Sequence, residues 1–144
     1  MRTTRPDASA RLSRARVGGA IAVDAVAVIA FAAIGRATHD GDVLGSWGLG
    51  LATTAWPFLV ALAIGWLACR GWRAPLAPLR TGVSIWLVTV VGGMLLRVLS
   101  GQGTAAPFVI VATLTLLLLL VGWRLVARLV VRRASTRVSR PTRS

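Results

Sequence analysis

The stretch Ala106–Val126 reads APFVIVATLTLLLLLVGWRLV, and Arg124 is its only charged residue. A hydrocarbon core of roughly 30 Å is crossed by about 20 consecutive, mostly apolar residues in an α-helix. A run of this length and composition therefore predicts a helix that spans a membrane.

Three further stretches have the same character, and they run over Val17–Gly35, Leu49–Cys69 and Gly82–Leu99. Inside a bilayer, a lone spanning segment satisfies its backbone polar groups only as a helix. The sequence therefore predicts an all-α protein, a bundle of four transmembrane helices. We expect these helices at about 17–35, 49–69, 82–99 and 106–131, within one membrane domain at 17–133.

The composition fits a membrane protein better than a soluble one. Of the 144 residues, 56% are hydrophobic, and all 17 basic residues are Arg, which gives a net charge of +13. Such a charge suggests nucleic acid in a soluble protein. Here the arginines lie beside the apolar stretches, so membrane topology explains them and no nucleic-acid partner is expected. The basic tails at 1–16 and 134–144 are predicted to be disordered.

The arginines are distributed unevenly between the two sides. Five precede the first stretch, three follow the second, and seven run from Arg124 onward, whereas the other side holds Arg36 and Arg97. The positive-inside rule then predicts that both termini and the middle loop are cytoplasmic. We expect a multi-pass protein that lies in the plasma (cell) membrane in this orientation.

Tryptophans and further arginines mark the expected membrane boundaries. Trp47 and Trp56 fall at the outer boundary, and Trp66, Trp72, Trp86 and Trp123 fall at or near the inner one. We interpret them as membrane anchors, because indole rings prefer interfaces. Arg124, Arg128 and Arg132 form a stripe on one helix face. This stripe predicts contact with anionic lipid headgroups, although snorkelling at a helix end explains it equally well.

The second and fourth stretches share a pattern that suggests an internal repeat. Thr54–Val60 (TAWPFLV) resembles Thr104–Ile110 (TAAPFVI), and Gly71–Arg73 (GWR) matches Gly122–Arg124. The pattern predicts two helical hairpins of the same orientation, related by a pseudo-two-fold axis along the membrane normal. The alternative is coincidence, since Pro suits the first turn of any helix.

Asp24 is the residue with the strongest functional signal. It lies about seven residues into the first stretch, roughly 10 Å below the cytoplasmic boundary, and a lipid-facing carboxylate there costs about 2.5–3.5 kcal/mol. Asp24 must therefore face the bundle or be protonated. Thr89 and Trp66 lie at the same depth and are the expected hydrogen-bond donors, whereas Arg97 lies too near the opposite surface. The group is a candidate intramembrane proton or cation site, or an interhelical hydrogen bond that fixes packing.

A second polar group lies on the outer side, at the end of the first stretch. Arg36, His39 and Asp40 are close in sequence, and Arg97 is expected at a similar height. Imidazole and carboxylate suit several metals, but these residues are too few to indicate a metal. Arg36, His39, Asp40 and Arg97 form a candidate outer-face polar cluster. Its cationic part could hold an anion, and an ordinary solvated turn is the alternative.

No motif for catalysis, a metal or a cofactor is present, so we expect no enzyme, no bound metal and no cofactor. No base accompanies the serines and threonines of the third stretch, which leaves nucleophilic catalysis without support. Cys69 is the only cysteine, and it has no partner for an internal disulfide.

The order of these motifs resembles one family. The residues that carry the resemblance are Asp24, Gly35-Arg36, His39-Asp40, Trp56-Pro57-Phe58, Arg97, Phe108-Val109 and Gly122-Trp123-Arg124. They are similar to the small four-helix membrane proteins of domain of unknown function family 3054. The resemblance covers about 24–124 and implies a four-span membrane protein without an assigned activity.

Three functional hypotheses of different classes follow from the sequence. The first is a small proton- or ion-coupled transporter or channel component, in which Asp24 titrates; with four helices, it requires a homodimer. The alternative is a non-catalytic membrane scaffold, or an accessory subunit bound to a partner membrane protein. An enzyme that acts on lipid headgroups has the least support.

Overall fold

The computed structural model describes residues 7–39, 44 and 49–138. Four long helices account for most of them: α1 (Asp7–His39), α2 (Leu49–Ala68), α3 (Ser84–Leu99) and α4 (Ala106–Val138). Between α2 and α3 lie a 3₁₀ turn, η2 (Gly71–Arg73), and a π-helical segment, η3 (Pro78–Val83). No strand occurs in the described residues, so the predicted all-α four-helix fold is confirmed.

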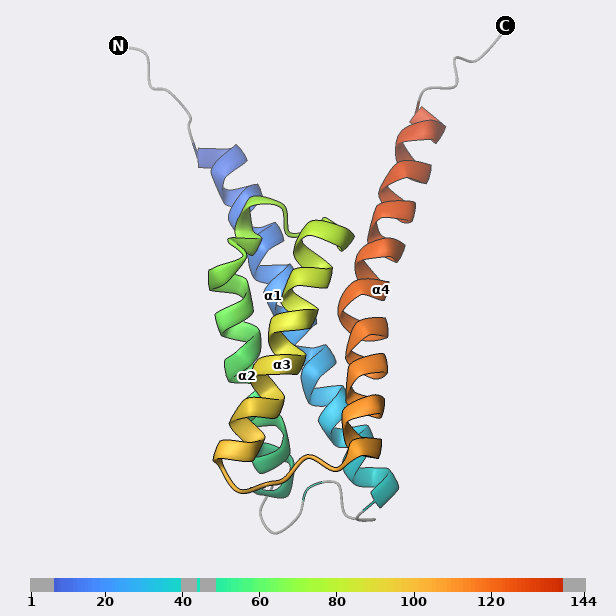
Figure 1. The fold of residues 1–144 in the computed structure, drawn as a ribbon. Helices are drawn as coiled ribbons and strands as arrows, with labels where there is room; N and C mark the ends of the chain where they lie inside the picture. The colour runs from blue at the N-terminus through green and yellow to red at the C-terminus, as the bar shows by residue number, and fades with distance from the viewer. Residues whose placement is uncertain (1–6, 40–43, 45–48, 139–144) are drawn as a thin grey trace, which may run out of the picture.

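The helices form an up-and-down bundle (Figure 1). The start of α1, the connection between α2 and α3 and the last turns of α4 lie at one end, which we call the basic end. The end of α1, the start of α2 and the connection between α3 and α4 lie at the opposite end. The alternation is what four successive membrane spans require.

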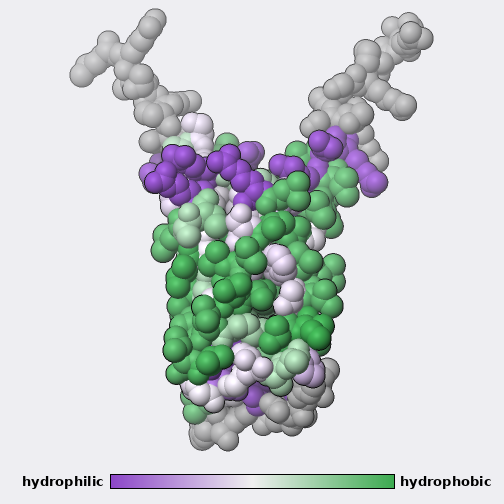
Figure 2. All heavy atoms as spheres, viewed as in Figure 1, coloured by the Kyte–Doolittle hydropathy of each residue, from purple (hydrophilic) through white to green (hydrophobic). Residues whose placement is uncertain are grey.

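The surface matches a multi-pass membrane protein. Within the described residues, four helical segments are long and apolar enough to cross a membrane: Ser9–Ala37, Leu49–Ala68, Pro78–Leu99 and Ala106–Arg133. Apolar residues cover the side of the bundle in Figure 2, and a band of hydrophilic residues lies across the basic end in this view. Exposed leucines such as Leu118 (71% exposed) lie within the apolar surface, where lipid tails would contact them.

The first and last helices are longer than the apolar stretches. α1 begins at Asp7 and α4 continues to Val138, so parts of both tails expected to be disordered are helical. Neither extension contains the Gly or Pro that would end a helix, while Pro6 and Pro141 lie just outside. Adding residues to an existing helix also avoids the unfavourable nucleation step. Residues 1–6 and 139–144 lie outside the described part.

Aromatic rings and small residues fill the core near the opposite end. The rings of Phe31, Phe58 and Phe108 pack together with centroid distances of 5.3–6.2 Å. The Phe58 ring of α2 occupies the space beside Gly93 of α3 where a side chain would lie, and Gly92 faces Ala61 in the same way. Small residues thus let α2 and α3 approach closely, as in other membrane bundles.

The two halves of the sequence repeat lie in different surroundings. Pro57 is buried in the interior of α2, whereas Pro107 is exposed in the first turn of α4. Gly71–Arg73 forms η2 after α2 has ended, whereas Gly122–Arg124 lies within α4. The pseudo-two-fold axis therefore stays a prediction.

Candidate functional site

The bundle encloses one buried acid, Asp24, among the side chains that the structure describes. It lies on the face of α1 that meets the other helices and has no exposed surface. The small residues Ala20 and Ala27 are its buried neighbours one turn before and after. They leave room on this face of α1 for long side chains from other elements to reach the carboxylate.

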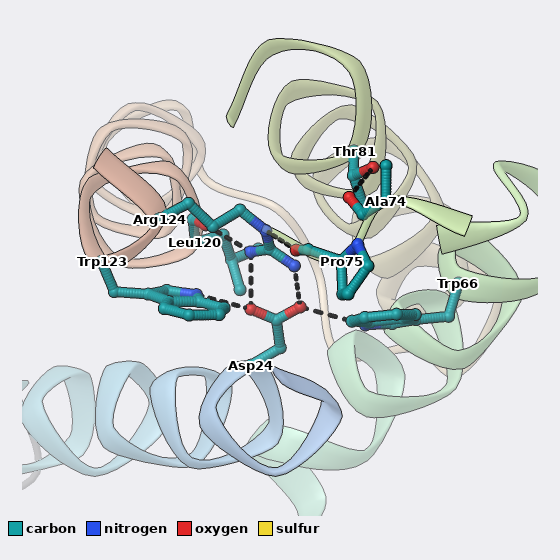
Figure 3. Close-up of polar contacts among 8 residues, drawn as sticks. All are labelled: Asp24, Trp66, Ala74, Pro75, Thr81, Leu120, Trp123 and Arg124. Atoms are coloured by element: carbon teal, nitrogen blue, oxygen red, sulfur yellow. Dashed lines mark hydrogen bonds and ion pairs between the residues drawn. The ribbon is translucent and has the colours of Figure 1, made fainter. Parts of the chain in front are cut away.

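Arg124 of α4 binds this carboxylate through both terminal nitrogens of its guanidinium group (Figure 3). Nη1 donates to Oδ1 at 2.8 Å and Nη2 donates to Oδ2 at 2.7 Å, and the Arg124 side chain is as completely buried as Asp24. This paired geometry is the strongest form of an Arg–carboxylate interaction. The two opposite charges thus cancel inside the membrane-spanning part of the bundle.

Two tryptophans complete the coordination of Asp24. The indole Nε1 of Trp66, on α2, donates to Oδ2 at 3.0 Å, and that of Trp123, on α4, donates to Oδ1 at 2.9 Å. The two indoles lie on opposite sides of the carboxylate in Figure 3. Each carboxylate oxygen therefore accepts two hydrogen bonds, which fills the roughly four acceptor sites of the group.

The guanidinium group of Arg124 is held on its other side by backbone carbonyls. Its Nε donates to the carbonyl of Pro75 at 3.0 Å, and Nη1 also donates to the carbonyl of Leu120, one turn back on α4. Arg124 thereby uses four of its five N–H donors. The face of Trp123 lies 4.7 Å from its guanidinium carbon, a distance at which a cation is attracted to the ring.

The connection after α2 is shaped to bring the Pro75 carbonyl to this place. Arg70 has a positive φ of 48° and ends α2, and η2 then turns the chain back. The hydroxyl of Thr81 donates to the carbonyl of Ala74 at 2.8 Å and fixes the segment next to Pro75. Gly82 leaves space for the Arg124 side chain, because a Cβ there would lie 3.0 Å from Cδ of Arg124.

These contacts join four parts of the fold through one carboxylate, and we call them the Asp24 network: Asp24, Trp66, Trp123, Arg124 and the Pro75 carbonyl. A buried ion pair is favourable only when its geometry is good and its remaining donors and acceptors are satisfied. Both conditions hold here. The network therefore fixes α1 against α2, α4 and the connection between α2 and α3.

The sequence-based expectations for Asp24 differ in their outcomes. The hydrogen bond expected from Trp66 is present. Thr89 is fully buried, but its hydroxyl has no hydrogen-bond partner among the described residues, so it does not bind Asp24. The interpretation of Trp66 and Trp123 as membrane anchors is wrong, because both indole N–H groups point into the bundle.

Arg124 is the functional residue that the sequence reasoning missed. It was expected in an exposed stripe with Arg128 and Arg132, yet it is fully buried. One signal could have found it: Arg124 lies inside the fourth apolar stretch, toward the same side of the membrane as Asp24 in the first stretch. An acid and a base within membrane helices on the same side of the bilayer are natural partners.

Among the residues of the outer-face cluster, the structure describes the side-chain surroundings of Arg36 and Arg97. The guanidinium group of Arg36 lies against Gly50, at the start of α2. The side chain of Arg97 donates to the side chain and backbone of Gln102 and to the backbone of Gly103, and its guanidinium carbon lies 4.3 Å from the Phe108 ring centroid. The side chain of His39 and all of Asp40 lie outside the described residues, so an anion site here stays a prediction.

Comparison with known proteins gives a family and no activity. The family described as "Protein of unknown function (DUF3054)" matches residues 21–127, a range that includes both Asp24 and Arg124. The resemblance drawn from the sequence motifs is thereby confirmed. No curated protein and no solved structure matches the chain.

Proposed function

We propose that this chain, which belongs to the DUF3054 family, is a non-catalytic membrane scaffold or accessory subunit. The function of the family is unknown, so the role is inferred from the residues of the chain itself. In this proposal it resides in the plasma membrane with the basic end and both termini in the cytoplasm, the orientation that the positive-inside rule favours. It contributes a rigid four-helix body to an assembly.

The observation that carries the proposal is the saturation of Asp24. A carboxylate that carries a proton or cation must exchange its ligands with water or ions during the cycle. Asp24 has no exposed surface, and four protein donors at 2.7–3.0 Å occupy its acceptor sites. These properties favour a structural role for the group over a transporting one.

The competing proposal, a proton- or ion-coupled transporter, requires the network to open. Arg124 would have to leave Asp24 and take its own charge to another partner or to water. Breaking the buried pair in this way leaves the Asp24 carboxylate buried without its counter-charge, at a penalty of several kcal/mol. We therefore place transport second.

Proton flux separates the two proposals. Wild type and Asp24→Asn are reconstituted into liposomes with an internal pH dye, and an ionophore added at the end confirms that the vesicles are sealed. A scaffold should give no flux above protein-free liposomes under a proton gradient or a membrane potential. Flux in wild type that disappears in Asp24→Asn would overturn the proposal in favour of transport.

Photo-cross-linking tests the scaffold role directly. A photoreactive amino acid is placed in living cells at Leu118, which is 71% exposed on α4, and in parallel at the fully buried Leu116 as the matched control. The proposal predicts a discrete cross-linked protein, either a second copy or another membrane protein, from position 118 and none from 116. Cross-links only to lipid from a panel of exposed positions on all four helices would contradict it.

A further inference from the structure

A pocket of about 520 Å³ lies at the basic end, next to the Asp24 network, with which it shares Pro75. It is formed by the first turns of α1, the segment around η2 and one position on α4. Its polar lining side chains are Ser9, Ser13, Arg16, Arg73 and Arg128. Ligand-binding pockets commonly have volumes of about 300–1,000 Å³, so this one is large enough for a small polar group.

The charged side chains that line this pocket, among those that the structure describes, are all arginines. Arg16, Arg73 and Arg128 come from three different elements, and no acid is among the described residues that line it. Within the described part of the chain, no side-chain hydrogen bond or ion pair engages these three guanidinium groups. Guanidinium groups bind phosphate through paired N–H donors. The lining therefore favours a phosphate-bearing anion.

An apolar groove of about 380 Å³ adjoins the pocket and extends along α1 and α2 into the apolar surface. Its lining includes Ile21 and Ala25 of α1 and Ala63 and Leu67 of α2, with no charged residue. Val17 and Trp72 line both the groove and the pocket. The two hollows therefore meet at Val17 and Trp72, and the arginines line the pocket whereas the groove has an apolar lining.

We propose that this combined site binds one anionic phospholipid from the leaflet at the basic end. The phosphate-bearing headgroup lies among Arg16, Arg73 and Arg128, and one acyl chain lies in the groove between α1 and α2. The half-exposed indole of Trp72 (45% exposed) lies at the junction, where an amphipathic ring contacts both parts of the lipid.

The groove is the reason to prefer a lipid over a soluble phosphate compound. A soluble anion would satisfy the arginines and leave the apolar groove to other molecules. A phospholipid fills both hollows at once, and the bilayer supplies it at high local concentration. The inference is independent of the scaffold proposal, because a transporter could hold the same lipid.

The test measures lipid binding by the purified full-length protein in mild detergent. Phosphatidylglycerol with brominated acyl chains is titrated in, and quenching of tryptophan fluorescence reports its approach to Trp72. Phosphatidylcholine with the same chains is the comparison lipid, and glycerol 3-phosphate is the soluble competitor. Trp66 also lines the groove, and a Trp72→Phe variant identifies the part of the quenching that comes from Trp72.

Two triple variants with the same change of charge separate the pocket from the general basic surface. The pocket variant is Arg16→Ala, Arg73→Ala and Arg128→Ala. The control variant is Arg11→Ala, Arg80→Ala and Arg133→Ala, at exposed positions that do not line the pocket. Circular dichroism and thermal melting check that both variants fold.

We expect wild type and the control variant to bind phosphatidylglycerol at least about tenfold more tightly than phosphatidylcholine, and the pocket variant to lose this preference. A charge-assisted hydrogen bond contributes about 1.5–3 kcal/mol, or roughly tenfold or more in affinity. Equal loss in both variants, or no lipid preference in wild type, would overturn the site. Full competition by glycerol 3-phosphate at equal concentration would replace the lipid with a soluble ligand.

The groove is tested by filling it. Ala63→Phe places a ring in the apolar groove at an exposed position and leaves the three arginines unchanged. It should weaken phosphatidylglycerol binding at least about fivefold, since each acyl methylene excluded from the groove removes roughly 0.8 kcal/mol, or about fourfold in affinity. An unchanged affinity would show that no acyl chain occupies the groove, and the proposed combined lipid site would then be wrong.

Discussion

The interaction between Asp24 and Arg124 makes a quantitative prediction about pairs of substitutions. Asp24→Asn keeps the size of the side chain but leaves the buried Arg124 cation without a counter-charge. Arg124→Met leaves the buried carboxylate without one. Removing one partner of a buried ion pair destabilises a protein by about 3–5 kcal/mol, so each single variant should lose that much.

The double variant should be more stable than either single variant. It has no buried charge. The defect that it adds to those of Asp24→Asn is the Pro75 carbonyl, which loses the Nε donor of Arg124 at 3.0 Å. An unsatisfied buried acceptor costs about 1–3 kcal/mol. The second substitution should therefore restore about 2 kcal/mol, the difference between these two losses.

The assay is reversible unfolding by SDS in mixed micelles, followed by far-ultraviolet circular dichroism. Arg80→Met, at an exposed position, is the control and should change the free energy of unfolding by less than about 0.5 kcal/mol. A double variant whose loss equals the sum of the two single losses would refute the reasoning, because it would mean that the two side chains do not interact in the folded protein.

Four further predictions concern the core and the topology. Thr89→Val removes a buried hydroxyl without a partner among the described residues, so the free energy of unfolding should stay equal or rise by about 1 kcal/mol; a loss above this size in SDS unfolding would indicate a bound water or ion. Gly93→Ala places a Cβ against the Phe58 ring and should destabilise by about 1–3 kcal/mol, and an unchanged melting temperature would contradict this packing. Trp123→Phe removes a hydrogen bond to a carboxylate and should lower the free energy of unfolding by about 1.5–3 kcal/mol. Trp86→Phe removes a hydrogen bond to the Thr113 carbonyl and should lower it by about 0.5–1.5 kcal/mol. Equal losses in the two variants would count against a charged Asp24. Enzymatic reporters fused to the two termini should both be active in the cytoplasm. Activity of either reporter on the outer side would contradict the proposed orientation.

The fold was predictable because a helix that spans a membrane needs an apolar run whose length matches the thickness of the hydrocarbon core. The four stretches gave the number of helices and their order. The ends of α1 and α4 were less predictable, because Arg-rich, Ser-rich segments such as 7–16 read equally well as tails. They become helical as continuations of stable membrane helices, which composition alone does not reveal.

Two members of the Asp24 network, Asp24 and Trp66, were predictable from the sequence, and the others were not. A carboxylate in a membrane helix requires a partner, and this requirement identified Asp24 and the donor Trp66. Arg124 was missed because a basic residue near the cytoplasmic end of a helix satisfies the positive-inside rule without any contact. The position of the Pro75 carbonyl depends on the turn at Arg70 and the π-helical η3, and neither has a sequence signal.

The rigidity of the bundle is the central claim, and distances between spin labels test it most directly. In a Cys69→Ser background, labels are placed at exposed positions of the basic end, Leu12 of α1 and Leu79 of η3, and at the opposite end, Ala37 of α1 and Leu99 of α3. Pulsed electron paramagnetic resonance in liposomes then gives the distance distribution of each pair. A scaffold fixed by the Asp24 network should show one narrow distribution at each end, unchanged by a proton gradient and broadened by Asp24→Asn. Two populations in wild type that shift in opposite directions at the two ends under a gradient would contradict the account and indicate alternating access.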